Sequence, residues 1–161
     1  MYNIVPASES DRAEILALYN SQKGREFCPW DEGYPTDNEI SYDLSRNALF
    51  VLKEDGLIKA AISLEKDEAV DALPCWSKQP SGELARLAVL PEEQNKRLGR
   101  IMLRFGMDEL KRRGYKAVHF LVNKHNAKAI RSYAVFGFKV VGECYMYEQE
   151  FLCYEGEFKG L

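Results

Sequence analysis

The sequence predicts an α/β (α+β) domain in which helices flank a mixed, mostly antiparallel sheet. Segments with strand and helix patterns alternate along nearly the whole chain. A strand, helix, strand unit from Glu83 to Asn123 implies one parallel pair, whereas adjacent β-rich runs on either side favour antiparallel hairpins. The chain has 161 residues, of which 46% are hydrophobic, which suits one core and is too little for two. We therefore expect residues 1–161 to form a single domain.

Two capping patterns place the first two helices. A short strand is predicted at residues 2–5, and Ser8 with Asp11 three residues later marks the start of the first helix. Thr36 and Glu39 form a second such capping box, in which two side chains satisfy unpaired N–H groups at a helix start. The sequence therefore predicts one strand followed by two short helices.

A hairpin and a further strand follow these helices. Residues 48–65 contain two β-rich runs separated by a turn, in which Gly56 supplies a positive φ. Residues 66–82 are polar and contain proline, so we expect a long loop there. Residues 83–90 have the pattern of a buried strand, which Pro91 terminates.

The second half of the chain begins with a strongly amphipathic segment. Residues 99–113 carry an apolar stripe at helical spacing, and Gly114 suits the position just after a helix end. The remaining elements are a strand, a helix capped by Asn126 and a terminal pair of strands, at residues 116–123, 126–137 and 138–158.

Charge and composition exclude several classes of protein. A formal net charge of −3 argues against a nucleic-acid binder or an anionic-membrane binder, either of which would need a basic surface. No apolar run approaches the roughly 20 residues that cross a bilayer. The cysteines have no CxxC spacing and the chain opens on a polar segment, so we expect reduced thiols and a cytoplasmic location. These cysteines are Cys28, Cys75, Cys144 and Cys153.

The segment PEEQNKRLGR, residues 91–100, has the features of an anion-binding loop. It joins a strand to a helix start, where unpaired backbone N–H groups and the helix dipole favour a phosphate. Lys96, Arg97 and Arg100 add positive charge. An alternative is that these are solvated loop charges and that Gly99 merely eases a turn. A nucleotide-binding domain is a weaker alternative, because neither G-x-x-x-x-G-K-[ST] nor G-x-G-x-x-G is present.

Two motifs together resemble the GNAT superfamily of N-acetyltransferases. In the first family motif, Gln or Arg is followed by two residues, Gly, one residue, and Gly or Ala at a helix start. Gln94 and Gly99 match this pattern, and Arg97 replaces its first glycine. The second motif is matched by Asn126, Ala129, Ile130, Tyr133, Gly137 and Phe138. The resemblance implies a GNAT-like sheet with a splayed central strand pair, and acetyl-CoA (coenzyme A) as the cofactor.

The resemblance also implies which residues bind the cofactor. Backbone N–H groups of the loop would hold the pyrophosphate, and the pantetheine arm would pair with the preceding strand. Arg97 is tolerable if its φ is ordinary, and its guanidinium could reach a phosphate; a positive φ would strain it by roughly 1–2 kcal/mol. The cofactor-binding residues implied are Leu87, Ala88, Val89, Gln94, Asn95, Lys96, Arg97, Leu98, Gly99, Arg100 and Asn126.

Acetyl transfer to an amine calls for an acid and a base. By resemblance, Tyr133 is the candidate general acid for the leaving thiolate, the alternative being a half-buried core tyrosine. Glu83 is the candidate base, acting directly or through water; an exposed strand-end carboxylate is at least as plausible. We expect His119 to be a hydrogen-bonded sheet histidine and His125 to lie in a surface loop. No cluster has zinc spacing, so we predict no metal.

The acceptor is predicted less sharply than the cofactor. Trp30, Asp31, Glu32 and Tyr34 lie in a loop that shapes the acceptor pocket in the resembled family, and acidic and aromatic groups suit a cationic amine. A polar loop pinned by aromatics explains the same residues, and Trp76 could form an opposite wall. We expect a primary amine, more readily that of a small molecule than of a protein. A non-catalytic acyl-CoA-binding sensor is the alternative function, and the chain could be a monomer or a homodimer.

Overall fold

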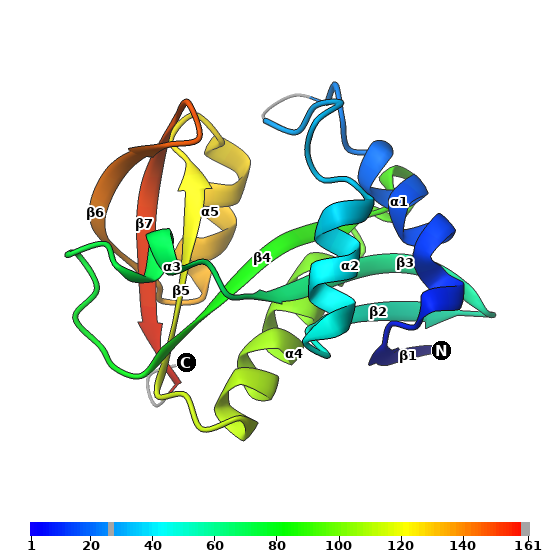
Figure 1. Cartoon of the computed structure of the whole chain (residues 1–161), viewed down its shortest axis with the longest axis horizontal. Helices are drawn as coiled ribbons and strands as arrows, with labels where there is room; N and C mark the ends of the chain where they lie inside the picture. Colours follow the sequence, from blue (N-terminus) through cyan, green and yellow to red (C-terminus); the bar gives the residue numbers. More distant parts are fainter. Residues whose placement is uncertain (26–27, 159–161) are drawn as a thin grey trace. The chain divides into compact units, whose positions relative to one another are not determined.

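The computed structural model describes residues 1–25 and 28–158, which build a seven-stranded sheet flanked by helices (Figure 1). The strand order is β1-β2-β3-β4-β5-β7-β6. The strands are β1 (Tyr2–Pro6), β2 (Leu49–Glu54), β3 (Leu57–Glu65), β4 (Ser81–Val89), β5 (Ala117–Asn123), β6 (Lys139–Met146) and β7 (Gln149–Glu157). The α-helices are α1 (Arg12–Asn20), α2 (Asp37–Ser45), α3 (Glu68–Asp71), α4 (Leu98–Arg112) and α5 (Ala127–Val135), and short 3₁₀ turns lie at Glu9–Asp11 and Pro91–Glu93.

The pairing of the strands confirms the predicted mixed, mostly antiparallel sheet. β1 with β2, β2 with β3, β5 with β7 and β6 with β7 are antiparallel, whereas β4 and β5 are parallel. The parallel ladder joins Ser81–Glu83 to Ala117–His119. Each strand continues beyond this ladder, β4 to Val89 and β5 to Asn123. The parallel ladder therefore covers only the first part of each strand.

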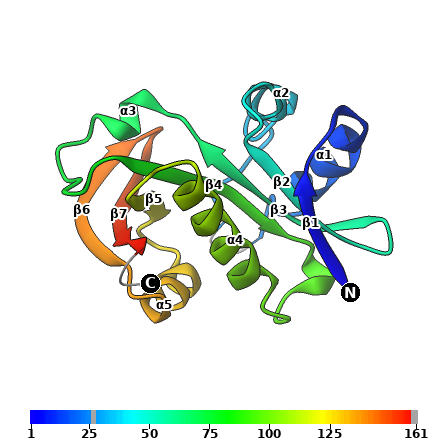
Figure 2. The same ribbon diagram turned by 90° about the horizontal axis from the view of Figure 1, so that it is seen from below.

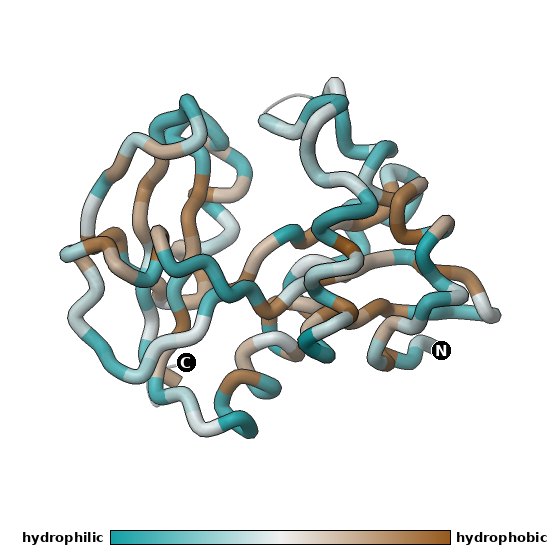
Figure 3. Tube along the Cα trace, viewed as in Figure 1, coloured by the Kyte–Doolittle hydropathy of each residue, from teal (hydrophilic) through white to brown (hydrophobic). Residues whose placement is uncertain are grey.

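The chain divides into two compact units. The first comprises residues 1–65 and 85–106, and the second comprises residues 66–84 and 107–161. Each unit has its own apolar core, and hydrophobic residues concentrate in the strands, whereas many turns are hydrophilic (Figure 3). The expectation that the whole chain acts as one domain stays a prediction.

In the first unit, helices cover both faces of the strands. Val51 of β2 lies in a buried cluster with Ile15 and Leu18 of α1. The preceding residue, Phe50, instead contacts Phe105 of α4, with ring centroids 5.0 Å apart. Because successive strand residues point to opposite faces, α1 and the first half of α4 lie on opposite sides of β2 (Figure 2).

In the second unit, helices also lie on both faces of the strands. Cys153 of β7 is buried against Val70 and Trp76 near α3. The next residue, Tyr154, packs on the other face, where its ring stacks 5.6 Å from Phe120 of β5. α3 and α5 therefore lie on opposite faces of these strands, as Figure 2 shows.

The structure contains the capping hydrogen bonds that were predicted at the helix boundaries. The Thr36 N–H donates to Glu39 Oε1 at 2.7 Å, and the Asn38 N–H donates to Thr36 Oγ1 at 3.2 Å. Asn126 Oδ1 accepts from the Ala129 N–H at 3.0 Å. Gly114 has a φ of 97° after the end of α4. The capping predictions at both helix starts and the helix end at Gly114 are confirmed.

The expectation of a long loop at residues 66–82 is wrong in two places. Asp67 caps the short helix α3 by accepting from the Ala69 N–H at 3.0 Å. Strand β4 begins at Ser81 and not at Glu83. A helix of four residues is too short to leave a hydrophobic period in the sequence, which is why the polar composition suggested a loop. Among the described helices, none is long and apolar enough to cross a membrane.

Candidate functional site

The loop between β4 and α4 has an unusual backbone. Asn95 has a φ of 68° and Arg97 a φ of 65°. The Ile101 N–H donates to the Arg97 carbonyl at 3.1 Å, which closes the first turn of α4. The N–H groups of residues 98–100 lie in that first turn, where a helix has no earlier carbonyls to offer them. Together with the helix dipole, this makes the junction suited to an anion.

Arg97 occupies the position where the resembled motif has glycine, and it keeps the left-handed backbone. The sequence left open whether Arg97 has an ordinary or a positive φ. Its φ is positive, and a non-glycine residue there is strained by roughly 1–2 kcal/mol. Asn95 tolerates the same region better, because short polar side chains can hydrogen-bond locally. The chain therefore retains the loop conformation at a cost in stability.

Gly99 lies in the first turn of α4 with an ordinary φ, unlike Arg97. A Cβ added to Gly99 would meet no atom of residues 1–25 and 28–158 within 4 Å, apart from its chain neighbours and the helix backbone. Neither backbone strain nor packing within the chain therefore requires glycine here. The open space above Gly99 leaves room for a group outside the chain to approach the backbone closely.

The positive charges of the loop fall into two sets. Lys96 Nζ and Lys59 Nζ both contact the Glu93 carboxylate, at 2.9 and 3.0 Å. These lysines, Lys96 first, hold the pKa of Glu93 below its ordinary value. Arg97 and Arg100 are exposed, and within residues 1–25 and 28–158 neither has an ion pair. The two arginines are thus the cations available to an anion at this helix start.

The end of β4 directs main-chain groups away from β3. The Leu90 N–H donates to the Lys59 carbonyl of β3 at 2.9 Å, so the Val89 carbonyl of the same peptide points the opposite way. That carbonyl accepts from Gln22 Nε2 at 2.9 Å and from Gln94 Nε2 at 3.4 Å. The side chain of Gln94 therefore fastens the loop to the strand end.

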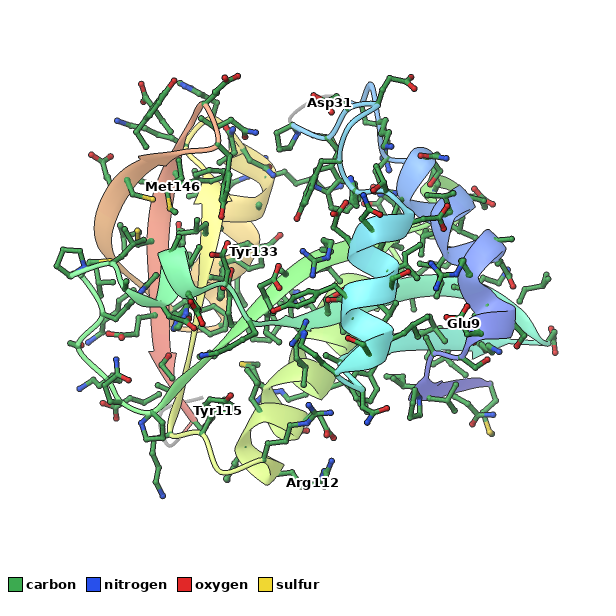
Figure 4. All side chains as sticks on the ribbon, viewed as in Figure 1. Glu9, Asp31, Arg112, Tyr115, Tyr133 and Met146 are labelled. Atoms are coloured by element: carbon green, nitrogen blue, oxygen red, sulfur yellow. The ribbon has the colours of Figure 1, made fainter. Side chains whose placement is uncertain are left out.

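In the second unit, Tyr133, which is labelled in Figure 4, lies in an aromatic cluster. Its ring centroid lies 4.9 Å from Phe120, 6.0 Å from Tyr154 and 6.3 Å from Phe138. Burial, with a smaller contribution from Tyr154, raises the pKa of Tyr133 to about 12. The phenol is therefore protonated at any physiological pH. Asn126, also predicted to bind cofactor, uses Oδ1 to cap α5.

Glu83 lies opposite His119 in the parallel ladder, and both side chains are buried. His119 Nδ1 is 2.7 Å from Ser81 Oγ, and its Nε2 is 3.0 Å from Asp71 Oδ1. These bonds confirm that His119 is a hydrogen-bonded sheet histidine. Burial lowers the pKa of His119, against the opposing effect of Asp71. His125 is exposed, as expected for a surface loop.

The position of Trp76 argues against a role as a wall of the acceptor pocket. Its side chain packs in the core of the second unit, stacked on His119 with ring centroids 4.4 Å apart. Its indole Nε1 donates to the Val70 carbonyl at 2.7 Å. Little of the ring is available to a ligand.

The predicted acceptor loop packs against the first unit through Trp30 and contains a hydrogen bond of its own. Trp30 packs edge-on against Tyr19 at 5.6 Å, and the Gly33 N–H donates to Asp31 Oδ1 at 2.8 Å. Asp31 and Glu32 are exposed, and Asp31 lies near the tip of the loop in Figure 4. The neighbouring Glu26 and Phe27 lie outside the described residues.

Arg86 of β4 was not singled out from the sequence, yet it organises this part of the first unit. Its Nη2 donates to both carboxylate oxygens of Asp43, at 2.9 and 3.0 Å, and its Nη1 contacts Glu65 Oε2 at 2.6 Å. The same Nη1 donates to the Tyr34 hydroxyl at 2.9 Å. The side chains of Arg86 and Asp43 are 2% and 0% exposed, so this is a desolvated ion pair. A charged residue inside an apolar strand was the signal available in the sequence.

Comparison with known proteins shows which family the chain belongs to. The family described as "Acetyltransferase (GNAT) family" matches residues 14–138. The chain belongs to this family. The predicted enzyme class and cofactor are thereby confirmed at the level of the family: the protein is an acetyltransferase that uses acetyl-CoA. No curated protein matches the acetyltransferase by direct sequence comparison.

Solved structures show the same fold at low sequence identity. The loading GNATL domain of CurA from Lyngbya majuscula has a TM-score of 0.79 with the acetyltransferase at 16% identity, over 100% of both chains. The ribosomal-protein-S18-alanine N-acetyltransferase from Escherichia coli has a TM-score of 0.74 at 20% identity, over 98% of this chain and 94% of that one. The putative acetyltransferase yncA from Salmonella typhimurium, solved with acetyl-CoA, has a TM-score of 0.74 at 22% identity, with the same coverage.

The residues of the β4–α4 junction fit the cofactor of the family. A pyrophosphate needs N–H donors, positive charge and room near the backbone. The first turn of α4 offers the donors, Arg97 and Arg100 offer charge, and Gly99 leaves the space open. The acetyltransferase therefore has a chemically suitable place for coenzyme A in its first unit.

Proposed function

We propose that this acetyltransferase transfers the acetyl group of acetyl-CoA to a primary amine, most readily that of a small molecule. The observation that carries the proposal is the β4–α4 loop. Asn95 and Arg97 keep positive φ, and Gly99 stands at the helix start with open space above it. No described residue fills the space above Gly99, and these features suit a bound pyrophosphate.

Coenzyme A would be held mainly by main-chain groups. In the proposal, the N–H groups of residues 94–100 receive the pyrophosphate, and the guanidinium groups of Arg97 and Arg100 add charge. The pantetheine arm lies along the end of β4, residues 87–89. Because the Val89 carbonyl already accepts from Gln22 and Gln94, the arm must displace one of these amides or pair through Leu87.

The reaction is a direct attack of the amine on the thioester carbonyl. A C–N bond forms, the C–S bond breaks, and the proton lost by the amine balances the one gained by the thiolate. Glu83 takes up the amine proton, directly or through water, in the proposed scheme. Tyr133 is the proposed general acid for the leaving sulfur.

The raised pKa of Tyr133 refines its role. Complete proton transfer from a phenol of pKa about 12 to a thiolate of pKa about 8.5 is uphill by roughly 5 kcal/mol. Tyr133 therefore acts chiefly by donating a hydrogen bond to the sulfur as negative charge develops there. The proton released by the attacking amine then completes the exchange.

The acceptor is proposed to bind near residues 30–34. Asp31 and Glu32 are exposed carboxylates that lie between Trp30 and Tyr34 in the sequence, and acidic and aromatic groups suit a protonated amine before it loses its proton. Tyr34 is held in place by Arg86. A protein amine is the competing acceptor class, since one protein of the same fold is named for acetylating an alanine of a ribosomal protein.

A coenzyme A release assay across acceptor classes tests this proposal. Polyamines, amino acids, aminoglycosides and peptides with free N-termini should be compared at one acetyl-CoA concentration. Release that depends on a small amine supports the proposal, whereas release with peptides alone reassigns the acceptor. Tight acetyl-CoA binding without turnover on any amine would instead identify a non-catalytic sensor.

A further inference from the structure

Three potential metal ligands from separate segments converge in the second unit. Asp71 at the end of α3, Glu83 of β4 and His119 of β5 each offer one ligand atom, and these atoms lie within 4.8 Å of one another. We propose that Asp71, Glu83 and His119 form a binding site for a divalent transition-metal ion of the Zn²⁺ type. The sequence predicted no metal site, because these three residues are too far apart in the chain to show the spacing of zinc ligands.

The donor set has the chemistry that such an ion prefers. One imidazole nitrogen and two carboxylate oxygens are the N and O ligands that Zn²⁺ binds, and three protein ligands leave a fourth position for water. Glu83 and His119 are opposite each other in the parallel ladder, so the backbone of the sheet fixes their separation. Their exposed fractions are 6% and 2%, whereas the Asp71 side chain is 27% exposed. Asp71 is thus the side from which an ion enters.

The imidazole is already oriented for a ligand on Nε2. Its Nδ1 is hydrogen-bonded to Ser81 Oγ at 2.7 Å, and its ring is stacked on Trp76 with an interplanar angle of 18°. Its Nε2 faces Asp71 Oδ1 at 3.0 Å. Metal-bound histidines usually have their second nitrogen held in this way, which fixes the tautomer and the ring plane. Ser81 is therefore the residue that positions His119.

The surrounding charges leave room for a cation. Lys66 Nζ contacts Asp71 through Oδ2 at 2.9 Å, so the Oδ1 atom that faces His119 is a separate donor. The lysine is half exposed. The carboxylate of Glu155 in the same unit accepts from the N–H groups of Ser77 and Lys78. Asp71 and Glu83 each offer a carboxylate oxygen within 4.8 Å of the imidazole ligand atom, and two carboxylates beside one imidazole suit a divalent cation.

Binding of the metal ion requires the imidazole hydrogen of His119 to move from Nε2 to Nδ1, and the ring loses no proton overall. Without metal, a hydrogen on Nε2 donates to Asp71 Oδ1 while Nδ1 accepts from the Ser81 hydroxyl. With metal, the Nε2 lone pair binds the ion, and the imidazole hydrogen moves to Nδ1, which donates to Ser81 Oγ. A serine hydroxyl can both donate and accept, so it serves both tautomers.

Equilibrium dialysis of untagged full-length protein against Zn²⁺, with metal analysis, tests the site. We expect one equivalent to bind to the wild type. Asp71→Asn should remove binding, and Ser81→Ala, which removes no ligand, should weaken it ~10–100-fold. Glu68→Gln is the matched control, because it removes a negative charge from α3 without touching the cluster, and it should bind like the wild type. Circular dichroism of each variant establishes that it is folded.

Substitution of Co²⁺ for Zn²⁺ distinguishes this site from the thiols of the same unit. A Co²⁺ spectrum with d–d bands and no thiolate charge-transfer band supports the N and O ligand set. A thiolate band, which would come from Cys75, Cys144 or Cys153, overturns the proposal. So does absence of stoichiometric binding to a folded wild type, or binding that Asp71→Asn leaves unchanged. None of the three substitutions alters Glu83 or Tyr133, and metal binding is measured without acetyl-CoA, so this test can fail independently of the proposed acetyl transfer. With the ion bound to Glu83, the amine proton would have to leave by a route other than direct transfer to this carboxylate.

Discussion

Asn95 and Arg97, two residues apart, both have positive φ, at 68° and 65°. The loop between β4 and α4 thus keeps the backbone of a glycine-containing anion site although neither position is glycine. The cost falls mainly on Arg97, because asparagine tolerates the left-handed region better than arginine does. A strained residue retained at a helix start suggests that the loop conformation is needed for binding and not for packing.

Relief of this strain should stabilise the protein without ligand. Arg97→Gly is expected to raise the free energy of unfolding by up to about 1 kcal/mol, since relief of strain outweighs the greater freedom of glycine in the unfolded chain. Asn95→Gly should give a smaller gain. Urea denaturation measures both. An Arg97→Gly protein that is less stable than the wild type would contradict the account of strain.

The guanidinium of Arg97 can be separated from its backbone by a second substitution. Arg97→Ala removes the charge and keeps a side chain that is strained at positive φ. Both Arg97→Ala and Arg97→Gly should weaken acetyl-CoA binding at low salt, by roughly 5–150-fold if the charged hydrogen bond contributes about 1–3 kcal/mol. Calorimetric titration at two salt concentrations measures the effect. Equal affinity of wild type and Arg97→Ala would show that the arginine makes no phosphate contact.

Tyr133→Phe should separate chemistry from binding. The substitution keeps a ring against Phe120 and Tyr154 and removes the hydroxyl that is proposed to face the sulfur. We expect the turnover rate to fall ~100-fold or more while the affinity for acetyl-CoA stays nearly unchanged. Steady-state kinetics with the best amine from the acceptor panel, together with calorimetry, provides both numbers. An unchanged rate would assign Tyr133 to the aromatic core alone.

The elements that could be predicted from sequence are those fixed by neighbours in the chain. Thr36 and Glu39 are three residues apart, and their capping box is visible as a pattern. Gly114 and Asn126 mark helix ends by their own conformational and hydrogen-bonding preferences. The loop proposed to bind the cofactor was visible for the same reason, since its backbone N–H groups and its helix are contiguous in the chain.

The features that could not be predicted join residues far apart in sequence. Arg86 meets Asp43 and Glu65 because β4 and α2 pack around one core, and no local pattern records that meeting. His119 and Asp71 are brought together by the fold of the second unit. Helix α3 was missed because four residues are fewer than the period needed to recognise a helix.

The buried ion pair of Arg86 with Asp43 should contribute more to the free energy of unfolding than an exposed salt bridge does. Arg86→Met leaves the buried Asp43 and the partly buried Glu65 without their main cation, and we expect a loss of about 3 kcal/mol or more in the free energy of unfolding. Arg112→Met removes an exposed arginine that contacts Glu109, and serves as the control with a much smaller effect. Similar losses in the two variants would contradict the importance of burial.

Alkaline pH should destabilise the fold partly through Tyr133. Burial raises the pKa of this phenol to about 12, whereas an unfolded chain has a tyrosine pKa of about 10. The neutral form is therefore favoured by folding, and its stabilising effect is complete below pH of about 10 and lost as the pH rises toward about 12. Denaturation at several alkaline pH values should show a steeper decline for the wild type than for Tyr133→Phe, by less than about 3 kcal/mol. Parallel declines would indicate that Tyr133 is not protected from solvent.

The most direct test of the cofactor site uses two substitutions at Gly99 and one calorimetric titration with acetyl-CoA. The protein has room for a side chain there, so Gly99→Ala and Gly99→Leu should both fold, and both residues are good helix formers. We expect Gly99→Ala, whose methyl group is small, to bind acetyl-CoA nearly as well as the wild type. Gly99→Leu should lose binding, because its side chain fills the space proposed for the pyrophosphate. Unchanged affinity in a folded Gly99→Leu protein would contradict the placement of coenzyme A at this helix start.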